Sequence, residues 1–212
     1  MAVTKTTHTQ GQARRDHLRA EVLAVVERHL KEGATYADLN VAGVASEAGI
    51  SRSTFYAYFV DKPTLLRTWY AESTEQILEA ARRWWSLDAT VTRAELRAVL
   101  VRIVEAYQLH PELMAATHEA IGIDHGVREV VDTAMDRYVD GLRVHIETGQ
   151  AEGFVDSSLP PAETAYWLQW MAERVLHRLE RDTDDVGPSK FIEAYACIVW
   201  NTLYAPTRSR PS

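Results

Sequence analysis

The sequence predicts an all-α protein. Long stretches of the chain repeat apolar residues at the three- and four-residue spacing of a helix with one buried face. The ten glycines and seven prolines are few and cluster at the breaks between these stretches, and no convincing strand-like alternation appears. Hydrophobic residues make up 46% of the 212 residues, which is enough to bury a sizeable core.

The first helix is expected over residues 14–32, ending before Gly33. The preceding residues 1–13 are rich in Thr, Gln and Gly and are expected to form a flexible tail. Asn40 is the expected N-cap of a second helix that begins at Val41. The inner face of the first helix is expected to comprise Leu18, Val22, Val25, Val26 and Leu30.

Residues 41–62 predict two short helices that meet at a tight corner. Gly49 follows the apolar stripe of the first, where a helix C-terminus favours a residue that tolerates a left-handed backbone. Ser51 stands where the N-cap of the next helix belongs. Phe55 and Phe59 share the buried face of that helix, which leaves hydrogen-bonding heads and small groups outside. A short helix with such an outer face suits the DNA major groove.

At these residues the chain resembles the TetR family of transcriptional regulators, over about residues 14–68. The resemblance implies a three-helix helix-turn-helix DNA-binding domain over residues 14–62. A fourth helix then joins it to a larger ligand-binding and dimerisation domain over residues 63–205, with a flexible tail at 206–212 and about nine helices in all. The matching positions are Ala45, Ala48, Gly49, Ile50, Ser51, Ser53, Thr54, Phe55, Tyr56, Tyr58, Phe59, Lys62, Leu65 and Leu66.

The resemblance also implies which side chains meet double-stranded DNA. Arg52, Ser53 and Tyr56 are expected at base edges, and the others at phosphates or beside the groove. The expected set is Asn40, Val41, Ser51, Arg52, Ser53, Thr54, Tyr56, Ala57, Tyr58 and Lys62, in which Thr54, Tyr58 and Lys62 hold phosphates. The alternative is an ordinary helical hairpin with solvated Ser and Tyr residues. Two roles are open for Lys5, Arg14 and Arg15. They either contact DNA outside the main groove or belong to a solubilising tail, which is the preferred alternative.

The net charge of −7 is unevenly distributed. Residues 1–67 hold nine Lys/Arg and seven Asp/Glu, a net of +2, whereas residues 68–212 hold fourteen and twenty-three, a net of −9. One end can therefore meet phosphates while the rest is acidic. Because +2 is modest, DNA affinity is expected to depend on specific contacts and dimerisation more than on bulk charge.

The remaining periodic stretches predict helices over residues 63–85, 93–110, 111–122, 126–152, 161–181 and 190–204. The helix over 63–85 has apolar residues for two cores and is a candidate lever between the domains. The last two helices are apolar on more than one side and need a further partner, which the resemblance identifies as a second copy in a four-helix homodimer interface. Its expected residues are Leu168, Met171, Val175, Arg178 and Val199.

Aromatic and polar side chains on the later helices predict a small-molecule pocket. Such residues are usually plain core, but this set places polar tips on an apolar wall, as ligand sites do. The expected lining is Leu96, Leu100, Ile103, Tyr107, Tyr138, Leu142, Gln169, Trp170, Glu173, Leu176 and His177. The spacing around residues 171–174 is similar to that of the ethionamide-regulator subgroup, whose pocket is a long apolar channel. Ala172 stands where that subgroup has a pocket amide.

The sequence offers little chemistry for an enzyme, a metal site or a cofactor. His110, His118 and His125 lie close in sequence, but no pair has the i, i+4 spacing of a helical zinc clamp. Glu173 and His177 are four apart, yet nothing nearby resembles a nucleophile or a phosphate loop. We therefore expect Glu173 and His177 to form an ion pair, or to bind the polar group of a ligand in a pocket, in preference to a catalytic role.

A soluble, cytoplasmic protein is expected. The single Cys197 cannot form an internal disulfide, the N-terminus lacks a signal peptide, and no run approaches the ~18 apolar residues of a membrane span. The expected function is a repressor released from a palindromic operator by a small hydrophobic or aromatic ligand. The alternative is a DNA-binding regulator without an effector, whose second domain serves dimerisation or protein contacts.

Overall fold

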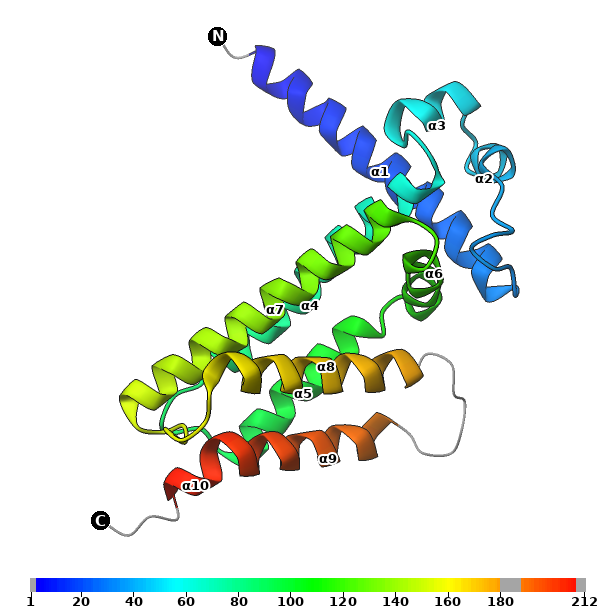
Figure 1. The fold of residues 1–212 in the computed structure, drawn as a ribbon. Helices are drawn as coiled ribbons and strands as arrows, with labels where there is room; N and C mark the ends of the chain where they lie inside the picture. The colour runs from blue at the N-terminus through cyan, green and yellow to red at the C-terminus, as the bar shows by residue number, and fades with distance from the viewer. Residues whose placement is uncertain (1–2, 180–187, 209–212) are drawn as a thin grey trace. The chain divides into compact units, whose positions relative to one another are not determined.

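The computed structural model describes residues 3–179 and 188–208 (Figure 1). Every regular element within these ranges is helical, which confirms the all-α class. In chain order the elements are α1 (Val3–Lys31), α2 (Val41–Glu47), α3 (Arg52–Tyr58), α4 (Lys62–Trp85), α5 (Arg93–Tyr107), α6 (Pro111–Ile121), α7 (His125–Glu152), α8 (Pro161–Leu179), α9 (Pro188–Val199), the π-helical turn η1 (Trp200–Tyr204) and α10 (Ala205–Arg208). None of these helices combines the length and apolarity that a bilayer crossing requires.

The chain divides into two compact units, which are described separately below. The first unit comprises Met1–Tyr70 and Glu112–Arg128, and the second comprises Ala71–Pro111 and Glu129–Ser212. This division differs from the boundary expected after residue 62, because the start of α4 and most of α6 belong to the first unit. Helix α4 contributes residues to both units, as expected for a helix with apolar residues for two cores.

Helix α1 begins at Val3, so residues 3–13 continue the helix where a flexible tail was expected. No proline interrupts this stretch, and adding a residue to an existing helix gains a hydrogen bond without repeating the cost of nucleation. Val22, Val25 and Val26 of the expected inner face are buried. Gly33 follows the helix with a φ of 96°, in the left-handed region that glycine favours.

The second unit has one large apolar core, to which α4, α5, α7, α8 and α9 all contribute. Helices α8 and α9 lie side by side (Figure 1). Helix α9 ends sooner than expected and continues as the π turn, in which the carbonyl of Leu203 accepts a hydrogen bond from the amide of Asp156 at 3.0 Å. Residues 205–208 are helical although a tail was expected from 206, and the predicted end of the helix over 161–181 lies outside the described residues.

Gly141 allows helices α4 and α7 of the second unit to pack closely. A Cβ built on this residue of α7 would collide with the indole ring of Trp85 at the end of α4. The absence of a side chain at Gly141 therefore makes room for a large aromatic ring from a neighbouring helix. Two further links join the same two helices: Tyr138 Oη donates to the carbonyl of Thr74 at 3.0 Å, and Arg137 pairs with Glu75 at 2.8 Å.

Candidate nucleic-acid interface and ligand region

The corner between α2 and α3 is held by local hydrogen bonds that the sequence indicated. Asn40 caps α2, its Oδ1 accepting from the amide of Ala42 at 2.9 Å. At the other end of α2, Gly49 has a φ of 69°, and the next amide, of Ile50, donates to the carbonyl of Ala45 at 2.9 Å. A Cβ at Gly49 would meet nothing within 4 Å, so its replacement would be penalised by the backbone conformation alone.

Helix α3 is anchored by two aromatic rings and exposes the side that was expected to face DNA. Phe55 and Phe59 are fully buried, with ring centroids 5.2 Å apart. Tyr56, by contrast, is 44% exposed, and its ring stands edge-on to Phe55 with centroids 5.7 Å apart. The remaining expected contacts on this helix divide into exposed Arg52, Ser53 and Ala57 and half-buried Thr54 and Tyr58.

Lys62, expected to bind a phosphate, has partners within the protein. Its ammonium group donates to the carbonyls of Tyr36 at 2.7 Å and Ala37 at 3.2 Å, and lies 4.4 Å from the centroid of the Tyr36 ring. Burial, together with nearby Asp124 and Asp61, raises the pKa of Tyr36 to about 12. The amide of Tyr36 in turn donates to Glu119 Oε2 at 3.1 Å. Lys62 therefore holds the loop that precedes α2, a role that the sequence analysis missed.

Replacing Lys62 by Met should weaken this loop more than it changes contact with the DNA backbone. Losing hydrogen bonds from a charged donor should cost about 1.5–3 kcal/mol of folding stability. The slope of log affinity against log salt on random-sequence duplex DNA should stay unchanged, whereas loss of one phosphate contact would reduce it by about 0.9. Lys31→Met is the control, because Lys31 is an exposed lysine that pairs with Glu27 four residues earlier on the same helix. A reduced slope for Lys62→Met with normal stability would restore the phosphate role.

Two contacts of Glu47 brace the first unit, and no local signal in the sequence indicated them. Arg28 pairs with Glu47, and His29 Nε2 lies 3.0 Å from the other oxygen of the same carboxylate. Arg28 holds the pKa of Glu47 below its usual value, with a smaller contribution from His29. These contacts join α1 to α2 across 18 and 19 residues of sequence. Helix-spacing arguments cannot detect pairs at that separation.

Part of the expected ligand pocket is filled by the core of the second unit. Leu96, Leu100 and Leu142 are buried in one apolar cluster, and Ile103 packs against it. Leu168 and Val199, expected at the dimer interface, are only 3% and 0% exposed and belong to the same cluster. The placement of these two residues is therefore corrected: they stabilise the single chain, because α8 and α9 turn those sides inward.

The other expected pocket residues lie outside that packed cluster. Tyr107 and Tyr138 are buried, while Gln169, Glu173, Leu176 and His177 of α8 are half-buried. Trp170 is 37% exposed and faces outward, which does not fit a pocket lining. A surface groove of about 290 Å³ occurs elsewhere, between α4 and α5, and its mixed lining comprises Glu79, Ala80, Arg83, Arg102, Glu105, Ala106 and Leu109.

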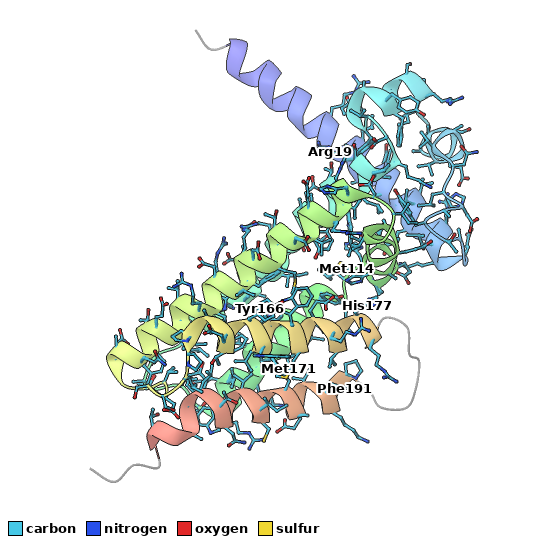
Figure 2. All side chains as sticks on the ribbon, in the orientation of Figure 1. Arg19, Met114, Tyr166, Met171, His177 and Phe191 are labelled. Carbon is cyan, nitrogen blue, oxygen red and sulfur yellow. The ribbon has the colours of Figure 1, made fainter. Side chains whose placement is uncertain are left out.

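A row of large apolar side chains lies exposed on α8 and α9, which we call the α8–α9 face. It comprises Tyr166, Trp167, Trp170, Met171 and Ile198, which are 52%, 67%, 37%, 37% and 46% exposed. Figure 2 labels two of its members, Tyr166 and Met171, along α8. Tyr166 and Trp170 are four residues apart, as are Trp167 and Met171, so the four share one side of the helix. Val175 is half-buried and Arg178 is exposed.

A polar network is buried in the core of the second unit. His145 Nδ1 lies 3.0 Å from the carbonyl of Trp85, the last residue of α4, and its Nε2 lies 2.8 Å from Tyr204 Oη. Because a carbonyl only accepts, Nδ1 carries the proton and the neutral Nε2 accepts from Tyr204. Tyr204 Oη accepts in turn from Trp84 Nε1 at 3.0 Å. Burial lowers the pKa of His145, while the hydrogen bond to Trp85 acts more weakly in the opposite direction.

Among the residues that the structure describes, no group of three or more His, Cys, Asp and Glu side chains is arranged to hold a metal ion. His110, His118 and His125 do not form such a group. The exposed hydroxyl, phenol and guanidinium groups of α3 remain the clearest functional constellation. Their arrangement on a short capped helix suits hydrogen bonding to base edges.

Comparison with known proteins agrees with this geometry. Residues 34–68 match the family described as bacterial regulatory proteins, tetR family, and residues 96–205 match the family described as transcriptional regulator EthR, C-terminal domain. The regulator EthR of Mycolicibacterium smegmatis is 26% identical over 195 residues, covering 89% of this chain and 87% of that protein. EthR of Mycobacterium tuberculosis is 29% identical over 156 residues, covering 73% and 72%.

Solved structures share the fold at low sequence identity. A TetR-family regulator from Syntrophomonas wolfei superposes with a TM-score of 0.70 at 16% identity, covering 86% of this chain and 93% of that one. Another from Mesorhizobium loti gives 0.69 at 14% identity, covering 91% and 99%. Since the EthR-type match alone spans more than half of the 212 residues, the chain belongs to the TetR family of transcriptional regulators, with a C-terminal region of the EthR type.

Proposed function

We propose that this protein is a repressor that binds a near-palindromic operator as a two-fold dimer and is released when a small hydrophobic or aromatic ligand binds its second unit. Regulators of the TetR family bind DNA and act as dimers. The observation that carries the proposal is helix α3, where Arg52, Ser53 and Tyr56 are exposed while Phe55 and Phe59 are buried. Such a helix can enter a major groove and present its polar heads to base edges.

In this proposal the residues of α3 divide between bases and phosphates. Arg52 suits guanine, whose O6 and N7 accept two hydrogen bonds from a guanidinium. Tyr56 and Ser53 read neighbouring positions, and the methyl group of Ala57 suits a thymine methyl. Thr54 and Tyr58, at the half-buried edge of the helix, meet phosphate oxygens and set the register.

Arg52→Ala should relax base preference at one position of each half-site. Losing a base-reading arginine should cost about 1–3 kcal/mol on the preferred site and much less on random DNA. The control is Arg102→Ala, which removes an exposed arginine from the second unit. Binding-site selection followed by titration of the selected duplexes measures both effects. An unchanged preference for Arg52→Ala would contradict its assignment to base edges.

The α8–α9 face supports the dimer part of the proposal. Its five large apolar side chains remain exposed on one chain, and exposed apolar surface on neighbouring helices is typical of an interaction site. A second copy related by a two-fold axis would cover this face with the same face. Met171, Val175 and Arg178 of the expected interface remain members of this proposed surface. A two-fold protein repeats its reading helix on DNA, which is why the operator should be a near-palindrome.

The ligand part of the proposal is placed in the second unit, at residues other than those of the apolar cluster that contains Leu96, Leu100 and Leu142. The EthR-type match covers residues 96–205. The proposed lining is Tyr107, Tyr138, Gln169, Glu173, Leu176 and His177, none of which belongs to the filled apolar cluster. Apolar parts would supply most of the affinity, about 0.8 kcal/mol for each buried CH₂. The polar heads would orient the polar group of the ligand.

The filled core also favours an alternative, a regulator of the same fold without an effector. Four expected pocket residues, Leu96, Leu100, Ile103 and Leu142, pack within the protein itself. A heat-shift screen against hydrophobic compounds, followed by operator titration with each stabilising compound, separates the two functions. An effector should weaken operator binding about five- to a hundredfold, the usual range of coupling between sites. Stabilising compounds without any effect on operator affinity would support the alternative.

A further inference from the structure

Three hydroxyl groups meet at the start of α3. Ser51 Oγ accepts a hydrogen bond from the amide of Thr54 at 3.0 Å, which is the N-cap contact of the helix. The same oxygen lies 2.8 Å from Ser53 Oγ and 2.8 Å from Thr54 Oγ1. Both distances are those of O–H···O hydrogen bonds, so each contact carries a proton. Ser53 and Thr54 are also the hydroxyls of the face proposed to read DNA.

The number of protons restricts how these contacts can be made. A hydroxyl has one hydrogen to donate and two lone pairs to accept. One lone pair of Ser51 is already used by the amide of Thr54. One hydrogen and one lone pair remain for two neighbouring hydroxyls. Ser51 must therefore donate to one of them and accept from the other.

This restriction gives Ser53 and Thr54 different hydrogen-bonding roles toward DNA. The neighbour that accepts from Ser51 keeps its own hydrogen and can donate to DNA. The neighbour that donates to Ser51 has no hydrogen left and offers only lone pairs to DNA. A free serine or threonine hydroxyl could rotate and do either, so the contact with Ser51 removes that choice.

We propose that Ser51 is a positioning residue that makes Thr54 a donor and Ser53 an acceptor at the DNA surface. The inference rests on the proposed function, in which Thr54 meets a phosphate oxygen. Phosphate oxygens only accept, so Thr54 must keep its hydrogen, and Ser53 must give its own to Ser51. In the major groove an acceptor can bind only an amino group, which adenine offers at N6 and cytosine at N4. Ser53 therefore selects adenine or cytosine and rejects guanine and thymine.

Binding-site selection with the full-length protein and with Ser53→Ala identifies the base position that depends on Ser53. The wild type should prefer adenine or cytosine there by about five- to tenfold, the lower end of a specific base contact. If the base is adenine, 7-deazaadenine, which lacks the N7 acceptor, should bind equally well. Replacement by 2-aminopurine, which lacks the amino group in the major groove, should remove the preference. A preference for guanine or thymine, or no position that depends on Ser53, would overturn the inference.

Ser51→Gly tests the positioning role itself. Glycine is nearly as good an N-cap, but both neighbouring hydroxyls become free to donate or accept. The preference at the Ser53-dependent position should fall to about twofold or less, whereas Ser51→Thr, which restores a hydroxyl, should recover it. Thr92→Gly is the control, because it removes the N-cap hydroxyl of α5 in the second unit. Equal unfolding midpoints of the Ser51 variants show that the fold is retained.

The outcomes separate this inference from the proposed function. Wild-type protein that enriches no motif would contradict the proposed function, and the inference would fail with it. A clear wild-type motif whose Ser53-dependent position stays as sharp in Ser51→Gly would overturn the inference alone. Loss of that preference in Ser51→Gly with recovery in Ser51→Thr supports it.

Discussion

Trp167→Glu should convert the dimer into a monomer at micromolar concentration without unfolding the chain. Trp167 is 67% exposed on the single chain, so its removal takes little from the protein's own core. In the proposed dimer the indole is buried, and a glutamate in its place would lose its hydration without a partner. Buried aromatic anchors of interfaces typically contribute about 2–4 kcal/mol, and an unpaired charge adds to the loss.

Ile198 and Val144 offer a matched comparison for this prediction. Both are 46% exposed aliphatic residues of the second unit, but only Ile198 lies on the α8–α9 face. Ile198→Glu should weaken the dimer, whereas Val144→Glu on α7 should leave it intact. Sedimentation equilibrium of all three variants measures the association, and near-ultraviolet circular dichroism checks the fold. Dimers of unchanged stability for both Trp167→Glu and Ile198→Glu would exclude this face as the interface.

Tyr204→Phe should destabilise the second unit by about 2–4 kcal/mol, because it leaves two buried groups without partners. The phenol oxygen accepts from Trp84 Nε1 and donates to His145 Nε2, and the residue itself is 0% exposed. Tyr138→Phe is the matched control: that phenol donates to the carbonyl of Thr74, and loss of this hydrogen bond should cost about 1 kcal/mol. Urea unfolding at one fixed protein concentration compares the variants. Equal losses for both would contradict the network.

The same network predicts acid sensitivity. Burial holds the pKa of His145 below its ordinary value of 6.5, so the unfolded chain binds a proton more readily than the folded chain. The stabilising contribution of neutral His145 is therefore complete above pH 6.5 and decreases as the pH falls through and below that value. His145→Gln should remove this part of the pH dependence. Unfolding free energies that respond to pH equally in the wild type and the variant would contradict a neutral, buried His145.

Local features were predictable from the sequence because the contacts behind them are local. Asn40 and Ser51 cap helices through amides two and three residues away, and Gly49 supplies the left-handed turn between them. Periodicity likewise located the buried Phe55 and Phe59. The partners of Lys62 could not be found in this way, since the two carbonyls to which it donates, of Tyr36 and Ala37, lie 26 and 25 residues earlier in the chain.

The surfaces of the second unit were harder to assign for a different physical reason. Helix α8 is apolar on two sides, and periodicity does not tell which side packs on its own chain. Leu168 faces inward, whereas Trp170 faces outward, the reverse of their expected placement at the dimer interface and in the pocket. Leu96 and Leu100 illustrate a related limit, because the same apolar residues can line a cavity or fill a core. Only the packing of neighbouring helices distinguishes these cases.

Selection of binding sites from random duplex DNA by the full-length protein is the most direct test of the central claim, that α3 of a two-fold dimer reads a specific operator. The account predicts an enriched inverted repeat, with half-sites about one helical turn apart or a multiple of it. It also predicts that Arg52→Ala relaxes one position in each half-site while Arg102→Ala leaves the motif unchanged. A selection that enriches no motif, or a motif that is identical for wild type and Arg52→Ala, would contradict it.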